Sequence, residues 1–180
     1  LIGSMSSRYK GIDVALKALC NAKKELPPFE FHILGGGNAE PFRELASRLG
    51  LSDITFFCGT LPGGDPVLNW LDDIDLYIQP SFQEGLPRAL IEAMSRGCPA
   101  LGSTAGGIPE LLDESCLHKP GDSKKLSEMI VKSVNNYEWL KQQARRNFIT
   151  ASDYTKEKLD KVRRDFWNEF AKYVESLNKR

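Results

Sequence analysis

The sequence lacks an excess of charge of either sign. Its 180 residues include 24 lysines and arginines and 24 aspartates and glutamates, so the formal net charge at pH 7 is zero. Proteins that attract nucleic acid through a general surface field carry a clear positive excess. We therefore expect no nucleic acid among the partners of this protein.

Cysteine and histidine are also scarce. The cysteines stand far apart, with no C-x-x-C pair, and the two histidines are isolated; the four cysteines are Cys20, Cys58, Cys98 and Cys116. This spacing excludes a structural zinc site of the usual kind. The apolar surroundings of each cysteine predict four buried, reduced thiols in a cytosolic protein.

Long apolar runs are missing as well. No stretch approaches the ~20 apolar residues that cross a bilayer, and the amino end shows no secretory signal peptide. With 41% hydrophobic and 27% charged residues, the composition is that of an ordinary globular protein. We expect one cytoplasmic domain over residues 1–180. The chain starts at Leu1, inside a predicted strand and without an initiator methionine, which predicts a fragment of a longer protein.

Short apolar runs alternate with segments of helical periodicity along the chain. This alternation predicts an α/β protein with a Rossmann-like, doubly wound parallel sheet of about six strands. The predicted strands are 1–3, 29–34, 54–58, 74–78, 99–101 and 116–118. The predicted helices are 12–26, 39–49, 66–71, 87–96, 108–112, 126–136, 138–149 and a long terminal helix within 150–180.

The terminal helix carries a wide apolar and aromatic stripe. Its members recur at helical spacing: Leu159, Val162, Phe166, Trp167, Phe170, Tyr173, Val174 and Leu177. Packing of the stripe on its own domain is the favoured interpretation. The alternative is that part of it contacts a second domain.

The most informative run is Glu84-Gly-Leu-Pro-Arg-Ala-Leu-Ile-Glu92, which follows a predicted strand and enters a predicted helix. A helix that begins near Pro87 leaves backbone amides free at its positive end, where a phosphate or a sugar hydroxyl accepts them. Gly85 allows a ligand to approach the backbone closely. Glu84, just outside the helix, is placed to bind sugar hydroxyls, and Glu92, over one turn inside it, to bind a ribose.

A structural alternative explains part of this run. Arg88, Glu92 and Arg96 follow each other at intervals of four residues and would form a ladder of surface ion pairs. The ladder does not explain why Glu84, Gly85 and Pro87 stand together after a strand. Nor does it explain the similar cluster Gly107-Ile-Pro-Glu110, which predicts a neighbouring loop of the same crevice.

Two other motifs carry less weight. Residues 35–37 are three glycines between a strand and a helix, but they lack the G-x-G-x-x-G spacing of dinucleotide binding. Asp72, Asp73 and Asp75 resemble a D-x-D metal motif, yet solvated carboxylates at the start of a strand explain them better. We expect no NAD site and no metal.

The motifs, taken in order, resemble the donor-binding half of family 4 retaining glycosyltransferases. The resemblance lies in the segments 80–87, 91–94, 97–99 and 106–110, and extends from Gly3 through Asp122. It implies the C-terminal domain of a GT-B enzyme, in which two Rossmann-like domains face each other across a cleft. The long helix at the end of such a domain returns to contact the first domain.

The resemblance also implies roles for individual residues. Glu84 contacts the transferred sugar, Glu92 holds the nucleotide ribose, and Lys10 neutralises the departing diphosphate. The amides of Gly85 and Leu86 meet the sugar or the diphosphate. Further expected contacts to the substrate come from Gly107 and Glu110, and the loops that face the nucleotide contain Gly36, Gly37, Gly59 and Leu61.

The sequence departs from the family pattern at Ser4, where many members carry an arginine. Arg8, two residues before Lys10, is an alternative source of that positive charge. Either Ser4 or Arg8 is therefore expected at the diphosphate.

The resemblance implies a retaining glycosyltransferase without a metal or other cofactor, active in polysaccharide biosynthesis. The donor is a nucleotide sugar and the acceptor a glycan or glycolipid held by a missing N-terminal domain, so this domain alone is expected to be inactive or weakly active. We expect the complete enzyme to be cytoplasmic, and peripheral attachment to the membrane face is compatible with these partners. Two alternatives remain: a GT-B sugar-nucleotide epimerase, and a non-catalytic module that binds a nucleotide sugar.

Overall fold

The computed structural model describes residues 1–177, so the last three residues of the predicted terminal segment lie outside it. The helices are α1 (Ile12–Ala22), α2 (Glu40–Arg48), α3 (Asp65–Leu71), α4 (Arg88–Ser95), α5 (Ile108–Leu111), α6 (Ser123–Val134), α7 (Tyr137–Ala151) and α8 (Lys156–Leu177). The strands are β1 (Phe31–Ile33), β2 (Thr55–Phe57), β3 (Tyr77–Gln79), β4 (Ala100–Ser103) and β5 (Leu117–His118). Short 3-10 turns complete the order: η1 (Arg8–Lys10), η2 (Ser52–Ile54), η3 (Glu114–Cys116) and η4 (Ser152–Tyr154).

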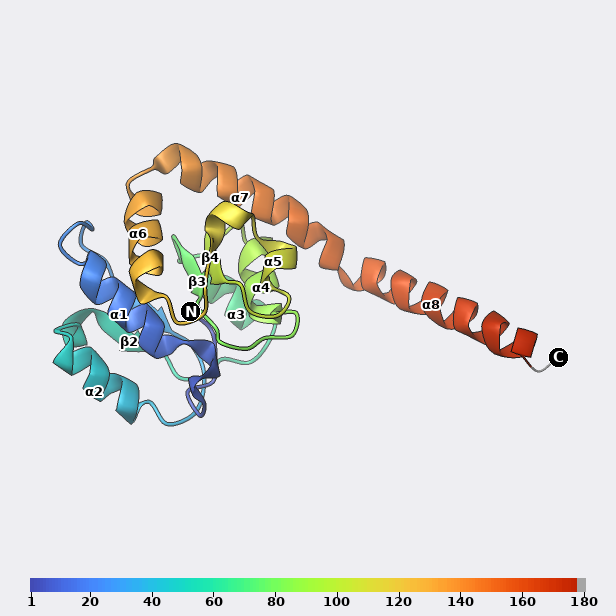
Figure 1. The fold of residues 1–180 in the computed structure, drawn as a ribbon, viewed down its shortest axis with the longest axis horizontal. Coiled ribbons are helices and arrows are strands. Elements are labelled where there is room, and N and C mark those ends of the chain that lie inside the picture. Colours follow the sequence, from blue (N-terminus) through green and yellow to red (C-terminus); the bar gives the residue numbers. More distant parts are fainter. Residues whose placement is uncertain (178–180) are drawn as a thin grey trace.

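All strand pairs are parallel, as the alternation of strands and helices predicts. β1 pairs with β2, and β3, β4 and β5 form a second ladder in that order. The helices α1 and α6 lie on one side of β3 and β4 in Figure 1, and α4 and α5 on the other. The chain thus has a Rossmann-like, doubly wound architecture.

The predicted strand count is too high by one. The segment 1–3 forms a single parallel bridge between Ile2 and Leu34, beside β1. On its other side, the Ile2 amide donates to the Tyr77 side-chain hydroxyl at 3.3 Å. A side chain thus takes the place of a backbone partner from β3, and no ladder forms there.

Helix α1 shows how the apolar pattern builds the core. Ile12, Leu16 and Leu19 recur at helical spacing and are all buried. The helix ends at Ala22, four residues before the predicted end, because residues 23–25 form a turn ahead of the prolines. Gly50 and Gly97 have φ values of 67° and 75° and end their helices in the left-handed conformation, as predicted.

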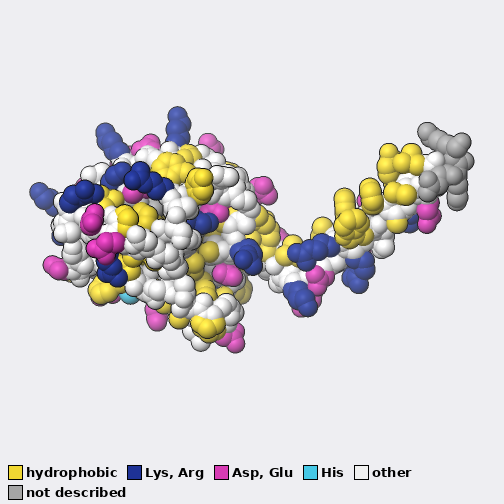
Figure 2. Space-filling view, turned by 90° about the horizontal axis from the view of Figure 1, so that it is seen from below, with side chains coloured by type: hydrophobic (Ala, Val, Ile, Leu, Met, Phe, Trp, Pro, Cys, Tyr) yellow, Lys and Arg dark blue, Asp and Glu magenta, His cyan; other side chains and the backbone are white. Residues whose placement is uncertain are grey.

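Helix α8 contradicts the favoured interpretation of the terminal stripe. It contains no buried residue, and it projects away from the rest of the molecule (Figure 1). Along the projecting rod, hydrophobic side chains lie on the surface together with charged ones (Figure 2). Trp167 is 62% exposed and Phe166 58%. Packing on its own domain was the wrong expectation, because α8 buries none of its residues and chiefly contacts η4, the turn that directly precedes it.

The cysteines correct another expectation. None of the four forms a disulfide, and Cys98 and Cys116 are buried as predicted, but Cys20 is only half-buried and Cys58 is exposed. Cys58 directly follows β2, which pairs with β1 and has no second neighbouring strand in residues 1–177. Among residues 1–177, no helix is long and apolar enough to cross a membrane.

Candidate functional site

The predicted site residues lie in loops at the carboxyl ends of the strands, where α/β proteins bind ligands. These loops are joined by backbone hydrogen bonds. The Met5 amide donates to the Gly36 carbonyl at 2.7 Å, and the Phe82 amide donates to the Tyr9 carbonyl at 2.7 Å. The Gly107 amide donates to the Gly85 carbonyl at 2.8 Å. The two loops that precede α4 and α5 are therefore neighbours, as the repeated Gly-Pro-Glu pattern indicates.

Glu84 and Lys10 meet at the centre of this edge. Glu84 Oε1 accepts hydrogen bonds from Lys10 Nζ, Gln79 Nε2 and Ser81 Oγ, each at 2.7 Å. The Glu84 side chain is 7% exposed and that of Lys10 28%. One carboxylate oxygen is thus fixed by three donors, and Oε2 has no hydrogen-bond partner in the described residues.

A network of buried side chains holds the Glu84 carboxylate through hydrogen bonds. Tyr77 donates its hydroxyl to Gln79 Oε1 at 2.7 Å, and Gln79 Nε2 also donates to Ser81 Oγ at 2.9 Å. The Ser81 carbonyl in turn accepts from Ser103 Oγ at 2.6 Å. Burial raises the pKa of Tyr77 far above its ordinary value, so the phenol remains a neutral donor.

The sequence did not identify this network. Tyr77, Gln79 and Ser81 alternate along β3 and the residues after it, which places their side chains on one face. A buried glutamine within an apolar strand was the available signal, because buried amides need partners.

Close backbone contacts fix the loop that carries Glu84. Gly106 has a φ of 53°, and a Cβ atom there would lie 2.0 Å from the Glu84 carbonyl oxygen. Gly11, with a φ of 66°, would place a Cβ atom 2.0 Å from the Pro80 carbonyl oxygen. Both positions require glycine for the approach as well as for the conformation.

The amino end of α4 offers free donors. Pro87 is the N-cap of this helix and not its first residue, so the helix begins one residue later than expected. Gly85 and Leu86 are exposed, and within residues 1–177 no acceptor is paired with either amide. A Cβ atom on Gly85 would meet nothing within 4 Å. The two amides are therefore available to a ligand.

Glu92 lies in α4 without a cation. The alternative of an ion-pair ladder is not observed in the described residues: Arg96 forms a bidentate pair with Asp72, with both N–O distances 2.7 Å, and no ion pair joins Glu92 to Arg88. Partial burial raises the pKa of Glu92, and the nearby charge of Arg88 opposes this effect. A half-buried carboxylate without an ion pair is suited to accept hydrogen bonds from a ligand.

The loops expected to face the nucleotide also come together. Gly37 is so close to the first loop that a Cβ atom would lie 2.5 Å from the Ser6 amide nitrogen. The Gly35 amide donates to the Gly59 carbonyl at 2.6 Å, and a Cβ atom on Gly36 would lie 3.1 Å from Thr60 Cγ2. The loops that follow residues 1–3, strand β1 and strand β2 thus form one continuous surface.

The remaining predicted residues lie at the exposed border of this surface. Ser4, Arg8, Leu61 and Glu110 are exposed, whereas Gly107 is buried beneath the Gly85 loop. Ser4 Oγ accepts from the Ser6 amide at 3.2 Å. Arg8 forms no ion pair with residues 1–177.

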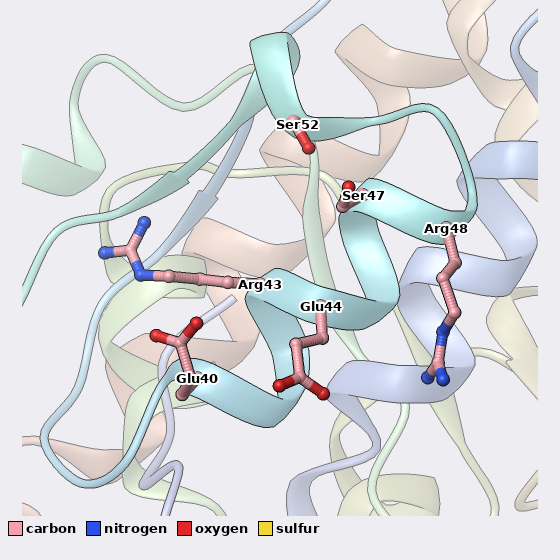
Figure 3. A pocket seen from close by; sticks show the side chains of 6 residues that line it. All are labelled: Glu40, Arg43, Glu44, Ser47, Arg48 and Ser52. Carbon is pink, nitrogen blue, oxygen red and sulfur yellow. The ribbon is translucent and has the colours of Figure 1, made fainter.

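A separate hollow lies on the outer face of α2. It is lined by Glu40, Arg43, Glu44, Ser47, Arg48 and Ser52 (Figure 3). Figure 3 shows these side chains standing on α2 and the turn that follows it. None of the predicted site residues contributes to this hollow.

Comparisons with known proteins agree with this geometry. The family described as "Glycosyl transferases group 1" matches residues 1–136. Protein CapJ of Staphylococcus aureus is 34% identical over 88% of this chain and 41% of its own length. The amylovoran biosynthesis glycosyltransferase AmsK of Erwinia amylovora is 32% identical over 68% of this chain and 32% of its own length.

Solved structures share the fold. HepE from Anabaena, solved in complex with UDP, has a TM-score of 0.78 at 21% identity, over 95% of this chain and 48% of its own. The C-terminal domain of the glycosyl transferase LpcC from Francisella tularensis has a TM-score of 0.74 at 20% identity, over 87% of this chain and 84% of its own. The chain spans less than half the length of CapJ, AmsK and HepE, and most of the separately crystallised LpcC domain.

Proposed function

The chain belongs to the group 1 glycosyl transferase family, and on this premise we propose that it is the donor-binding, C-terminal half of a retaining glycosyltransferase. The observation that carries the proposal is the fixed carboxylate of Glu84 beside Lys10 and the free amides that precede α4. This arrangement offers both acceptors and donors to a nucleotide sugar. HepE, which has the same fold, was solved in complex with UDP.

Glu84 binds the hydroxyls of the transferred sugar in this proposal. Its Oε1 is saturated by three donors, so Oε2 is left to accept from the substrate. The neighbouring amides of Gly85 and Leu86 donate to the sugar or to the diphosphate. Because three side chains hold the carboxylate in place before the donor arrives, little ordering is needed on binding.

Lys10 supplies positive charge to the leaving group. A departing nucleoside diphosphate gains negative charge as its bond to the sugar breaks, and a positioned ammonium stabilises that charge. One of the three ammonium protons is used by Glu84, which leaves two for phosphate oxygens. Ser4 and Arg8 border the same loop and are the candidates for a second contact.

Glu92 holds the ribose. Its two oxygens are suited to the vicinal hydroxyls of a ribose, and it has no ion pair to break when they bind. Gly36, Gly37, Gly59 and Leu61 border the surface on which the base then lies. Contacts there are mainly to the backbone, so the side chains do not identify the base. Glu110 completes the sugar side of the crevice, and Gly107, whose amide donates to the Gly85 carbonyl, supports the Gly85 loop.

The donor assignment is tested by calorimetric titration of the chain with UDP, GDP and ADP. We expect at least one of these nucleotides to bind. Glu92→Ala should lower its affinity at least about ten-fold, because a charge-assisted pair of hydrogen bonds is lost. Glu138→Ala, an exposed carboxylate of α7 outside the site, is the matched control and should bind as the parent chain does. Equal affinity in the Glu92 and Glu138 variants would refute the ribose role.

The acceptor is proposed from the relatives. AmsK is named for amylovoran biosynthesis and WcaL of Escherichia coli for colanic acid biosynthesis. We assign this protein to the assembly of a polysaccharide on a glycan or glycolipid acceptor, with retention of anomeric configuration and without a metal. In the complete enzyme, Lys10→Ala should abolish most turnover, and NMR of the product should show the anomeric configuration of the donor. Inversion, near-normal turnover of Lys10→Ala, or formation of an epimer without acceptor would overturn this assignment.

The exposed face of α8 is proposed to contact the preceding domain of the complete enzyme. Its aromatic residues are exposed in residues 1–177, and the chain spans under half of the length of CapJ. In the complete enzyme, Trp167→Ser should lower the melting temperature, and in the present chain it should not. If Trp167→Ser instead weakens binding of the complete enzyme to anionic vesicles and leaves its melting temperature unchanged, the exposed face of α8 binds a membrane surface.

A further inference from the structure

Glu30, His32 and Cys58 lie outside the candidate site, on the sheet of β1 and β2, and their side chains contact one another in this order. Glu30 Oε2 lies 2.7 Å from His32 Nε2, and His32 Nδ1 lies 3.9 Å from Cys58 Sγ. His32 is paired with Phe56 in the register of β1 and β2. Cys58 follows Phe56 by two positions, which places both side chains on the same face.

The order of the contacts gives each group a role. A bond from Nε2–H to Glu30 fixes the tautomer in which Nδ1 carries a lone pair, and that lone pair faces the thiol. A nucleophile, a base and a group that orients the base are the parts of an activated nucleophile. The other acceptor near the thiol is the Phe56 carbonyl, at 3.7 Å, and a carbonyl oxygen does not take up the proton.

The other three thiols lack this combination. Burial raises the pKa of Cys98 to about 11 and also raises the pKa of Cys116, so neither forms the reactive thiolate readily. Cys20 is half-buried and donates to the Leu49 carbonyl at 3.6 Å. Cys58 combines exposure with a base.

The surroundings of the imidazole are acidic and partly aromatic. The His32 ring lies 5.1 Å from the Phe56 ring and 6.4 Å from the Trp70 ring, measured between centroids. His32 also lines a cavity of about 900 Å³, whose acidic groups are Glu30, Asp53, Asp73 and Asp75.

We propose that Cys58 is a thiol modification site at which low-molecular-weight disulfides form a mixed disulfide, with His32 as the proton acceptor. The thiol proton passes to His32 Nδ1, and the thiolate attacks one sulfur of the incoming disulfide. A new S–S bond forms to Cys58 as the old one breaks, and the leaving thiolate takes up a proton. No net oxidant beyond the disulfide is needed.

The position of Cys58 connects this modification to the nucleotide. Cys58 directly precedes Gly59, whose carbonyl accepts from the Gly35 amide. A bulky adduct on Cys58 therefore stands beside two of the loops proposed to face the base. This consequence, unlike the thiol chemistry itself, rests on the proposed function.

The thiol site is tested by incubating the chain with glutathione disulfide at pH 7 and locating the adduct by peptide mass mapping. We expect most of the adduct on Cys58, with a rate at least about ten-fold lower in His32→Gln, since a positioned base contributes that much or more. Glu30→Gln should lower the rate by a smaller factor. In denaturant, all three chains should react at one rate, which separates a base effect from a loss of folded structure.

Two results would overturn the thiol proposal: an unchanged rate in folded His32→Gln, or an adduct spread evenly over Cys20 and Cys58. The connection to the nucleotide has its own readout. Calorimetry should show weaker nucleotide binding by the modified chain and parent affinity for Cys58→Ser. If the adduct forms on Cys58 and affinity is unchanged, the thiol site stands and the assignment of the Gly59 loop to the base falls.

Discussion

Replacement of Lys10 by methionine removes one donor from Glu84 and keeps the aliphatic stem. The stem matters because Lys10 Cγ packs over Gly3, where a Cβ atom would lie 2.7 Å away. Glu84 would retain its bonds to Gln79 and Ser81 and lose its counter-charge. The variant therefore isolates the ion pair from the packing around it.

The expected loss of stability in Lys10→Met follows from how deeply the Lys10–Glu84 ion pair is buried. Exposed ion pairs contribute about 0–1 kcal/mol, and removal of one partner of a fully buried pair costs about 3–5 kcal/mol. The Glu84 side chain is 7% exposed and that of Lys10 28%, which places this pair between the two limits. We expect Lys10→Met to lower the free energy of unfolding by about 2 kcal/mol, in the range for a hydrogen bond to a charged group.

Urea denaturation and thermal melting measure this change. A loss of about 2 kcal/mol corresponds to a fall of about 4–8 °C in melting temperature for a chain of this size. Lys17→Met is the matched control, since Lys17 pairs with Asp13 at 3.1 Å but is 50% exposed; it should change stability by less than about 1 kcal/mol. If both variants unfold with the same free energy as the parent, the pair does not stabilise the loop that carries Glu84.

Three further predictions concern these loops and the strand and helix beside them. Gly106→Ala should lower both stability and nucleotide affinity, because its Cβ atom would collide with the Glu84 carbonyl, whereas Gly85→Ala should leave the melting temperature unchanged and lower only the affinity. Ser103→Ala should cost about 1–3 kcal/mol in urea denaturation, because the buried Ser81 carbonyl loses its donor; no change would show that water replaces the hydroxyl. The raised pKa of Glu92 gives a stabilising contribution that is fully present below its unfolded pKa and is lost as pH rises through the folded pKa. Glu92→Gln should therefore be at least as stable as the parent at pH 7 while it binds nucleotide more weakly, and a lower melting temperature there would contradict this sign.

The sequence predicted the outline of the fold because apolar periodicity and glycine positions determine it. The spacing of Ile12, Leu16 and Leu19 predicted the buried face of α1, and Gly50 and Gly97 predicted two helix ends. The course of α8 was not predictable in this way. An apolar stripe shows that a surface must be covered, but not which surface covers it.

The site was predictable to a similar degree. The repeated Gly-Pro-Glu pattern located the loops of Gly85 and Gly107, which the structure joins directly. The bonds from Gln79 and Ser81 to Glu84 depend on side-chain directions that no local pattern specifies. The alternative of an ion-pair ladder at Glu92 is wrong because Arg96 pairs with Asp72, which is distant in sequence and close in space.

The most direct test of the account is the position of a bound nucleotide on the chain. Backbone amide NMR spectra during titration with the nucleotide that binds in calorimetry report this position. We predict that the largest shifts occur at Gly85, Leu86 and Arg88, and in the loops of Gly36 and Gly59. Shifts concentrated around Arg43 and Arg48 on the outer face of α2, or none at Gly85 and Leu86, would contradict the assignment of the donor site.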